Sequence, residues 1–227
     1  MSYRAQIKQH AKDQLHPRFW WLFLGFLIPT LISLALGGGQ GALNSLFNLE
    51  PRLLFSPLAL LSGVLPAASI LLCPFLAVGV ASLALKVARG EPATIGTPFI
   101  DGSVNYGRKL GGMLLVALYT LLWSFLFLIP GIVKAYAYSF TPYLLSECPN
   151  LKATDAISLS QRMTQGAKGE LFVFDLSFIL WGLLCTITGG LAGCYVIPYY
   201  YTAHATLYES IKKAALESGK VSPLELA

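Results

Sequence analysis

The sequence predicts an all-α fold: a polytopic membrane bundle of about six transmembrane helices, with two amphipathic helices at the membrane interface. Of its 227 residues, 55% are hydrophobic and only 12% are charged, whereas soluble proteins carry roughly 25% charged residues. Several long segments contain no charge, and Lys and Arg gather in alternate loops between them. This composition excludes a soluble enzyme.

The first part of the chain contains two predicted spans, each near the roughly 20 residues that a helix needs to cross a bilayer. The first covers residues 19–36 and ends at the glycine-rich segment 37–41, because glycine favours coil over helix. A cleaved secretory signal is disfavoured because the apolar stretch is too long and no clear cleavage site follows it. The second span covers residues 66–86. The apolar segment Leu53–Leu65 before it lies either at the interface or folded partly back into the membrane.

The rest of the chain contains four predicted spans arranged as two hairpins. Residues 111–128 and 130–146 form the third and fourth spans, because Pro130 suits the first turn of a new helix, where its missing N–H needs no partner. A single kinked helix, at about 1.5 Å per residue, would be longer than the roughly 30 Å hydrocarbon core. Residues 171–187 and 193–208 form the fifth and sixth spans. The hairpin motif, with a fainter echo in the sixth span, consists of Pro130, Gly131, Pro142 and Pro198.

The distribution of positive charge predicts the orientation of these spans. Of the 16 Lys and Arg residues, all but Arg52 and Lys134 fall in one of the two alternating sets of segments. Lys and Arg collect in the cytoplasmic segments of membrane proteins, so both termini are predicted to be cytoplasmic. The net charge of +5 indicates cytoplasmic loops and anionic lipid, and not a nucleic-acid partner.

Two segments outside the spans have the pattern of amphipathic helices. In residues 2–16, apolar side chains recur every four positions from Tyr3 to Leu15 beside basic ones, so this helix is predicted to lie on an anionic leaflet. The second helix, residues 153–165, lies at the interface or packs as an ordinary helix under the bundle. Residues 210–227 form a cytoplasmic tail.

Ionisable and hydrogen-bonding side chains within the spans are the candidates for a polar or ligand-binding site, because a charge at the bilayer centre costs about 2.5–3.5 kcal/mol. Asp175 either accepts hydrogen bonds from a neighbouring helix or forms a proton or cation site. Lys134 snorkels toward water, and His204 is either a packing residue or part of a transport path. Tyr136 and Tyr138 point to different faces of one helix, and an inward hydroxyl suits a polar seam or a lipid headgroup pocket.

No motif in the sequence predicts catalysis, a metal site or a cofactor. The four cysteines have no C-x-x-C spacing, and the chain contains no H-E-x-x-H, G-x-S-x-G or phosphate loop. We therefore predict a protein that is not an enzyme and holds no metal. Cys185 and Cys194 flank a glycine-rich turn, and the sequence leaves open whether they form a disulfide or remain two apolar thiols. Glu147 and Glu209 are predicted to pair with basic side chains from Arg162, Lys168, Lys212 and Lys213.

The stretch from Leu128 to Leu184 resembles the bacterial family known as domain of unknown function 975. The motifs that carry the resemblance are I-P-G-I, P-Y, a polar N-L-x-A segment and the run from E-L-F to W, at Ile129–Ile132, Pro142–Tyr143, Asn150–Ser160 and Glu170–Trp181. The family implies a multi-pass protein of the bacterial cytoplasmic (inner) membrane with no assigned activity. More distantly, the stretch is similar to the membrane domain of some glycerophosphodiester phosphodiesterases. Residues 37–66 depart from the pattern, because this first loop is longer and more apolar than the family predicts.

Two functional hypotheses follow from the sequence. The first is a non-enzymatic membrane protein that binds membrane lipid or a partner membrane protein, or that forms a homo-oligomer, because the chain has basic amphipathic segments and no buried array of charges. The alternative is a small transporter or exporter that uses proline-broken helices and Asp175, since interrupted spans often frame substrate sites.

Overall fold

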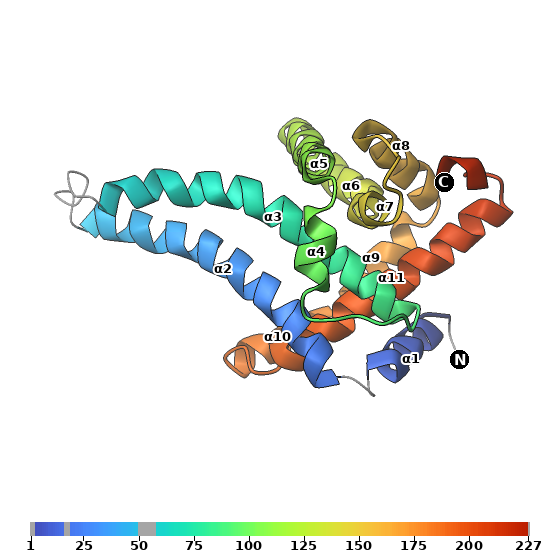
Figure 1. Cartoon of the computed structure of the whole chain (residues 1–227), viewed down its shortest axis with the longest axis horizontal. Helices are drawn as coiled ribbons and strands as arrows, with labels where there is room; N and C mark the ends of the chain where they lie inside the picture. The colour runs from blue at the N-terminus through green and yellow to red at the C-terminus, as the bar shows by residue number, and fades with distance from the viewer. Residues whose placement is uncertain (1–2, 16–18, 50–57, 227) are drawn as a thin grey trace.

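The computed structural model describes residues 3–15, 19–49 and 58–226 (Figure 1). Every regular element in these ranges is helical, which confirms the predicted all-α class. In chain order the elements are α1 (Tyr3–Leu15), α2 (Phe19–Leu49), α3 (Leu58–Ala88), α4 (Thr97–Ser103), α5 (Tyr106–Leu126), α6 (Leu128–Tyr138), α7 (Thr141–Glu147), α8 (Ala153–Thr164), α9 (Lys168–Leu176), α10 (Ile179–Ile187), α11 (Gly193–Glu217) and the 3₁₀ turn η3 (Pro223–Leu226).

Within the described residues, three helical segments are long and apolar enough to cross a membrane, namely Val64–Ala88, Tyr106–Leu126 and Lys168–Ile187. Large apolar side chains also stay exposed at the tip of the α5–α6 hairpin, where Phe125 and Ile129 are 81% and 75% exposed. A continuous apolar surface of this kind is typical of a membrane-associated protein. The predicted number of six crossings stays a prediction.

The first predicted span is wrong at its end. The prediction placed coil at residues 37–41, but α2 continues through these glycines as far as Leu49. Each glycine costs a helix up to about 1 kcal/mol relative to alanine. The long antiparallel contact between α2 and α3, which Figure 1 shows as an extended hairpin, offsets this local cost.

The segment Leu53–Leu65 is not a separate apolar element. Its residues 53–57 lie outside the described ranges, and its residues 58–65 form the first turns of α3. The predicted span 66–86 is thus the later part of one helix of 31 residues, in which Pro66 and Pro74 are accommodated. The prediction was wrong here because it treated Pro57, Pro66 and Pro74 as interruptions of the helix.

Two predicted spans are interrupted. The span expected at residues 130–146 consists of α6 and α7, separated at Ser139 and Phe140. Pro142 lies in the first turn of α7, where its missing N–H is tolerated, and it cannot continue α6. The span expected at 171–187 consists of α9 and α10, separated at Ser177 and Phe178. Ser177 donates its hydroxyl to the carbonyl oxygen of Phe174 at 2.5 Å.

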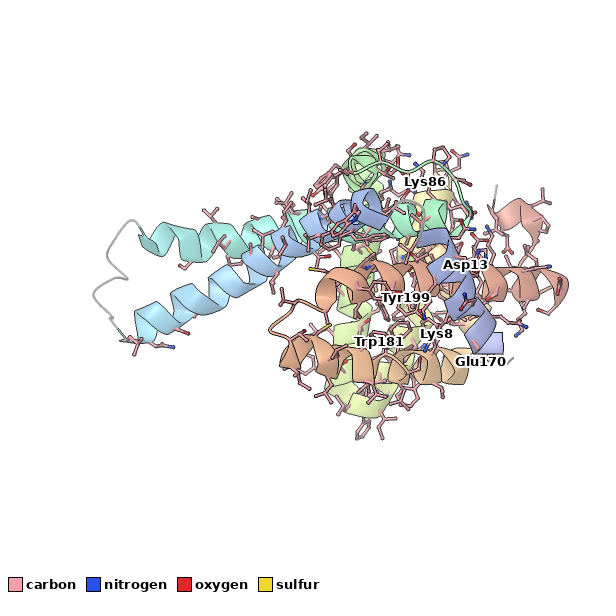
Figure 2. All side chains as sticks on the ribbon, turned by 90° about the horizontal axis from the view of Figure 1, so that it is seen from below. Lys8, Asp13, Lys86, Glu170, Trp181 and Tyr199 are labelled. Atoms are coloured by element: carbon pink, nitrogen blue, oxygen red, sulfur yellow. The ribbon has the colours of Figure 1, made fainter. Side chains whose placement is uncertain are left out.

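The predicted tight turn before Pro130 is present. Phe127, in an extended conformation, separates α5 from α6, so the third span ends at Leu126 and not at residue 128. Gly131 allows the two helices to touch, because a Cβ at this position would overlap Ser124. In Figure 1 this hairpin is seen nearly end-on while α2 and α3 run across the view, and Figure 2 shows the same large angle between the two hairpins.

The C-terminal helix is longer than the sequence predicts. The sixth span was expected at residues 193–208, but α11 continues to Glu217 with Pro198 inside it. Part of the expected tail 210–227 is therefore helical. The short helix α4 was not predicted, and it fills the return from α3 to α5.

The two amphipathic helices pack on the bundle. The apolar face of α1, formed by Ile7, Ala11 and Leu15, is buried in the main core, and α1 contacts α11. The prediction that this face lies on lipid is therefore wrong, because neighbouring helices cover it. Helix α8 buries Leu159 and Met163 and contacts α5, α6 and α7, as the alternative interpretation of residues 153–165 proposed.

The crossing of α3 and α4 depends on a glycine, and this generates a test. A Cβ on Gly79 would overlap the backbone carbonyl of Pro98, which cannot move as a side chain can. We expect Gly79→Ala to lower the free energy of unfolding by about 1–3 kcal/mol. Gly111→Ala is the matched control, since nothing lies within 4 Å of its Cβ position in α5. Thermal unfolding in detergent, followed by tryptophan fluorescence, should show a large loss only for Gly79→Ala; equal effects of the two would contradict the packing argument.

Candidate functional site

A cavity of about 420 Å³ lies between α2, α3, the α6–α7 break and α11. Its α3 wall is apolar and includes Leu76, Ala77 and Val80. The facing wall carries hydroxyl and imidazole groups, from Tyr143, Tyr200, Tyr201 and His204. One side of the cavity can therefore accept hydrocarbon while the other offers hydrogen bonds.

The polar wall centres on His204 and Tyr143. The Nδ1 atom of His204 lies 3.1 Å from the hydroxyl oxygen of Tyr143, and the two rings are stacked with centroids 5.7 Å apart. Phe140 packs its edge against His204 at 5.8 Å. The break between α6 and α7 makes this possible, because it turns the chain so that both Phe140 and Tyr143 face α11. His204 thus combines the packing role considered for it with a position on the cavity wall.

Asp175 lies next to this wall but is not among the residues that line the cavity. Its Oδ1 atom accepts a hydrogen bond of 3.1 Å from the Tyr200 hydroxyl, and Tyr136 approaches the same carboxylate from α6. The geometry matches the structural alternative for Asp175, in which a tyrosine of a neighbouring helix supplies the hydrogen bond. Tyr200 also touches the His204 ring, with centroids 5.8 Å apart, and so connects Asp175 to the cavity.

The other two candidates lie elsewhere. Tyr138 is buried in a small separate cluster with Ala137 and Ile157, and its ring contacts Tyr119. Lys134 lies over the ring of Trp123, with 4.8 Å between Nζ and the ring centroid. This cation–π contact holds the amine at the surface of the α5–α6 hairpin. The structure therefore brings together Asp175, His204 and Tyr136, and leaves Tyr138 and Lys134 apart from them.

A cluster of charged side chains, which we call the clasp, joins α3, α7 and α11 at one end of the bundle. Glu147 accepts hydrogen bonds from Lys212 at 2.6 Å and from the Tyr208 hydroxyl at 2.8 Å, and it pairs with Arg89 at 2.5 Å. Arg89 also donates from Nε to Glu209 at 2.8 Å. The predicted pairing is thus present for Glu147, through Lys212, but the partner of Glu209 is Arg89, which the sequence did not single out.

The remaining predicted partners act differently. Arg162 pairs with Glu225 of η3 at 2.6 Å and so fastens the C-terminal turn to α8.

Cys185 and Cys194 are free thiols in this structure. Among the described residues, no group of three or more His, Cys, Asp or Glu side chains could hold a metal ion.

Tyr143 and Tyr200 are the site residues that the sequence analysis missed. Both belong to helices rich in tyrosine, in which residue type alone does not mark a single position. A proline precedes Tyr143, but the equivalent Pro198 precedes Tyr199, which does not line the cavity, so the proline–tyrosine pair does not identify the site residues. Pro198 and Tyr199 are buried in α11.

The comparison with known families bears on the same segment. Residues 127–215 match the model of a family described as protein of unknown function (DUF975). We call these residues, which are similar to the family, the DUF975 segment. The resemblance predicted from Leu128–Leu184 is confirmed, and the distant similarity to glycerophosphodiester phosphodiesterases stays a prediction. No curated protein and no solved structure matches the chain.

The DUF975 segment supplies only part of the cavity. Its polar wall, with Tyr143, Tyr200 and His204, lies within residues 127–215, and so does Asp175. The apolar wall comes from α3, outside the matched segment. The clasp likewise joins Glu147 and Lys212 of the DUF975 segment to Arg89 outside it.

The clasp generates a prediction about pH. Burial alone would raise the pKa of Glu147, but hydrogen bonds from Lys212 and Tyr208 and the charges of Lys212 and Arg89 bring the pKa below its ordinary value of 4.5. Because the folded pKa is the lower one, the carboxylate contributes stability above pH 4.5, and this contribution is lost as the pH falls through the folded pKa.

We therefore expect Glu147→Gln to lower stability at pH 7 by about 1–2 kcal/mol, between the values for exposed and buried ion pairs. The difference from the wild type should shrink as the pH falls below 4.5 and through the folded pKa of Glu147, since both proteins then carry a neutral side chain. Thermal unfolding over a series of acidic pH values checks the prediction, with the exposed Glu170→Gln as control. A difference that stays unchanged at every acidic pH at which both proteins fold would show that shape, and not charge, is responsible.

Proposed function

We propose that this protein is a non-enzymatic protein of the bacterial cytoplasmic membrane that binds a lipid in the cavity between α2, α3, α7 and α11. The observation that carries the proposal is the two-sided lining of the cavity. Leu76, Ala77 and Val80 form an apolar wall, while Tyr143 and His204 offer hydrogen-bonding groups on the other. An amphipathic ligand matches both walls at once.

The size and surroundings of the cavity support a lipid. Its volume of about 420 Å³ falls in the range of small-molecule sites, roughly 300–1,000 Å³. Each CH₂ group that leaves water for an apolar wall contributes about 0.8 kcal/mol, so part of one acyl chain already gives useful affinity. The exposed apolar residues of α2 and α3 next to the cavity, such as Leu31 and Leu72, would provide a path from the bilayer.

The arrangement of the chain ends supports the proposed orientation. In Figure 1 both termini lie at one end of the molecule, opposite the last turns of α2 and the first turns of α3. The clasp with Arg89, Glu147 and Lys212 lies at the ends of α3, α7 and α11. Both termini and the clasp are thus proposed to face the cytoplasm, as the positive charge of these segments predicts.

Transport through Asp175 is a weaker candidate. It is favoured by the breaks after α6 and α9, which bring Phe140 and Phe178 close to polar groups of α11. However, Asp175 already accepts a hydrogen bond from Tyr200 and does not line the described cavity. Lipid binding needs no further opening of the bundle, so it is the better supported function.

Filling the cavity tests the proposal. Purified from its native membrane in a mild detergent, the wild type should carry lipid in native mass spectrometry. We expect Ala77→Trp to lower the lipid-bound fraction about tenfold, because the indole occupies the apolar part of the cavity. Ala117→Trp, the same change on an exposed position of α5, should leave it unchanged.

Three results would contradict lipid binding. One is lipid retention that is equal in Ala77→Trp and Ala117→Trp. Another is an empty cavity together with a copurifying membrane protein or a stable homo-oligomer, which would make a protein the partner. The third is solute flux in vesicles that Asp175→Asn abolishes.

The orientation has its own test. Reporters that fluoresce only in the cytosol, fused to either end of the chain, should both be active, and a reporter inserted after residue 50 should be silent. Activity at one terminus alone would mean an odd number of crossings, and the proposed arrangement of both termini would then be wrong.

A further inference from the structure

A second cavity, of about 370 Å³, lies where the end of α3 meets α4, the start of α5 and the end of α7. It shares no residue with the proposed lipid cavity between α2, α3, α7 and α11. Four cationic side chains line it, together with the acids Glu91, Asp101 and Glu147; the cations are Lys86, Arg89, Arg108 and Lys109. Figure 2 shows Lys86 at this end of α3.

The charges in this cavity are not balanced evenly. Arg89 is neutralised in the clasp by Glu147 and Glu209. Lys86 pairs with Asp101 at 2.7 Å, and Asp101 also accepts a hydrogen bond from Ser82. No ion pair in the described ranges neutralises Arg108 or Lys109.

Arg108 and Lys109 are held in place by neutral groups. Lys109, which is only 3% exposed, donates to the backbone carbonyl oxygen of Asp101. Arg108 donates to the carbonyl oxygens of Leu145 at 2.7 Å, Cys148 at 2.9 Å and Leu151 at 2.5 Å. Its Nε atom is buried and has no hydrogen-bond partner among the described residues.

The start of α5 adds to this positive potential. Arg108 and Lys109 lie in or next to the first turn of the helix, which contains no acidic residue. The positive end of the helix dipole therefore coincides with two cations, an arrangement that disfavours folding unless an anion is near. Asn105, which precedes the helix and lines the cavity, has a left-handed backbone with φ 53°. Strained residues of this kind cluster at binding sites.

We propose that this cavity binds a phosphate-bearing anion, with Lys86, Arg108 and Lys109 as its cationic contacts. A phosphate group can carry two negative charges, which matches Arg108 and Lys109, the two cations without an ion pair in the described ranges, and its several oxygens can accept from more than one donor. The phosphate belongs either to a lipid headgroup or to a free ion in the cytoplasm. Asp101 competes with the anion for Lys86.

The competition gives two variants with opposite expected effects. Lys86→Gln removes a cationic contact from a partly exposed position and should weaken anion binding about tenfold. Asp101→Asn removes the competing carboxylate and should strengthen binding by a similar factor. Lys213→Gln, an equivalent loss of charge on the exposed part of α11, should change nothing.

The experiment uses the full chain in a nonionic detergent. Its affinity for inorganic phosphate and for dihexanoyl phosphatidic acid is measured by calorimetry, with dihexanoyl phosphatidylcholine as zwitterionic control. Thermal unfolding without ligand first establishes that each variant folds. If both phosphate and phosphatidic acid bind, a free phosphate ion is sufficient to occupy the site. If phosphatidic acid alone binds, the ligand is the phosphate of a lipid headgroup.

The proposal is overturned if neither probe binds the wild type, or if Lys86→Gln and Asp101→Asn bind as the wild type does. Should Lys86→Gln fail to fold, the increase expected for Asp101→Asn decides alone. Ala77→Trp separates this site from the proposed lipid cavity, since it should lower lipid retention there and leave phosphate binding intact. Either site can therefore fail without the other.

Discussion

The contact of α7 with α11 is the interaction on which the arrangement of the other helices depends. Tyr143 is fully inside the protein and stacks on both His204 and Tyr208, with centroids 5.7 Å and 5.1 Å apart. At one end of this stack the Tyr208 hydroxyl reaches Glu147 in the clasp. At the other end Tyr200 binds Asp175. Polar groups buried in an apolar bundle must pair with one another, so this seam fixes how α7 and α9 lie against α11.

The sequence predicted the long helices and the turn before Pro130, but not the short helix α4 or the breaks at Ser139 and Ser177. A run of apolar residues indicates that a segment lies in lipid or in the core. The residues on both sides of Ser139 and of Ser177 are apolar, so hydropathy alone does not show that a helix ends there. Conversely, the glycines at residues 37–41 have poor helix propensity, yet α2 continues through them because packing on α3 compensates. Local propensity and long-range packing thus oppose each other at these positions, and packing decides.

The candidate site was predictable in part for a similar reason. Asp175 and His204 are unusual residue types in apolar segments, so composition alone pointed to them. Tyr143 could not be distinguished from other tyrosines, because only the break before α7 turns it toward α11. Arg89 was counted with the basic loop residues, and its two carboxylate partners are far from it in sequence.

Helix α1 illustrates a consequence for how the protein is made. Lys8 donates to the hydroxyl of Ser177 at 2.7 Å, at the break between α9 and α10, and lies over the Phe178 ring. Figure 2 shows Lys8 beside these helices. The N-terminal helix leaves the ribosome first, yet α9 and α11, on which it docks, are synthesised near the end of the chain. During translation the apolar face of α1 therefore stays partly uncovered until these helices are made, and its docking on them is a late step of folding.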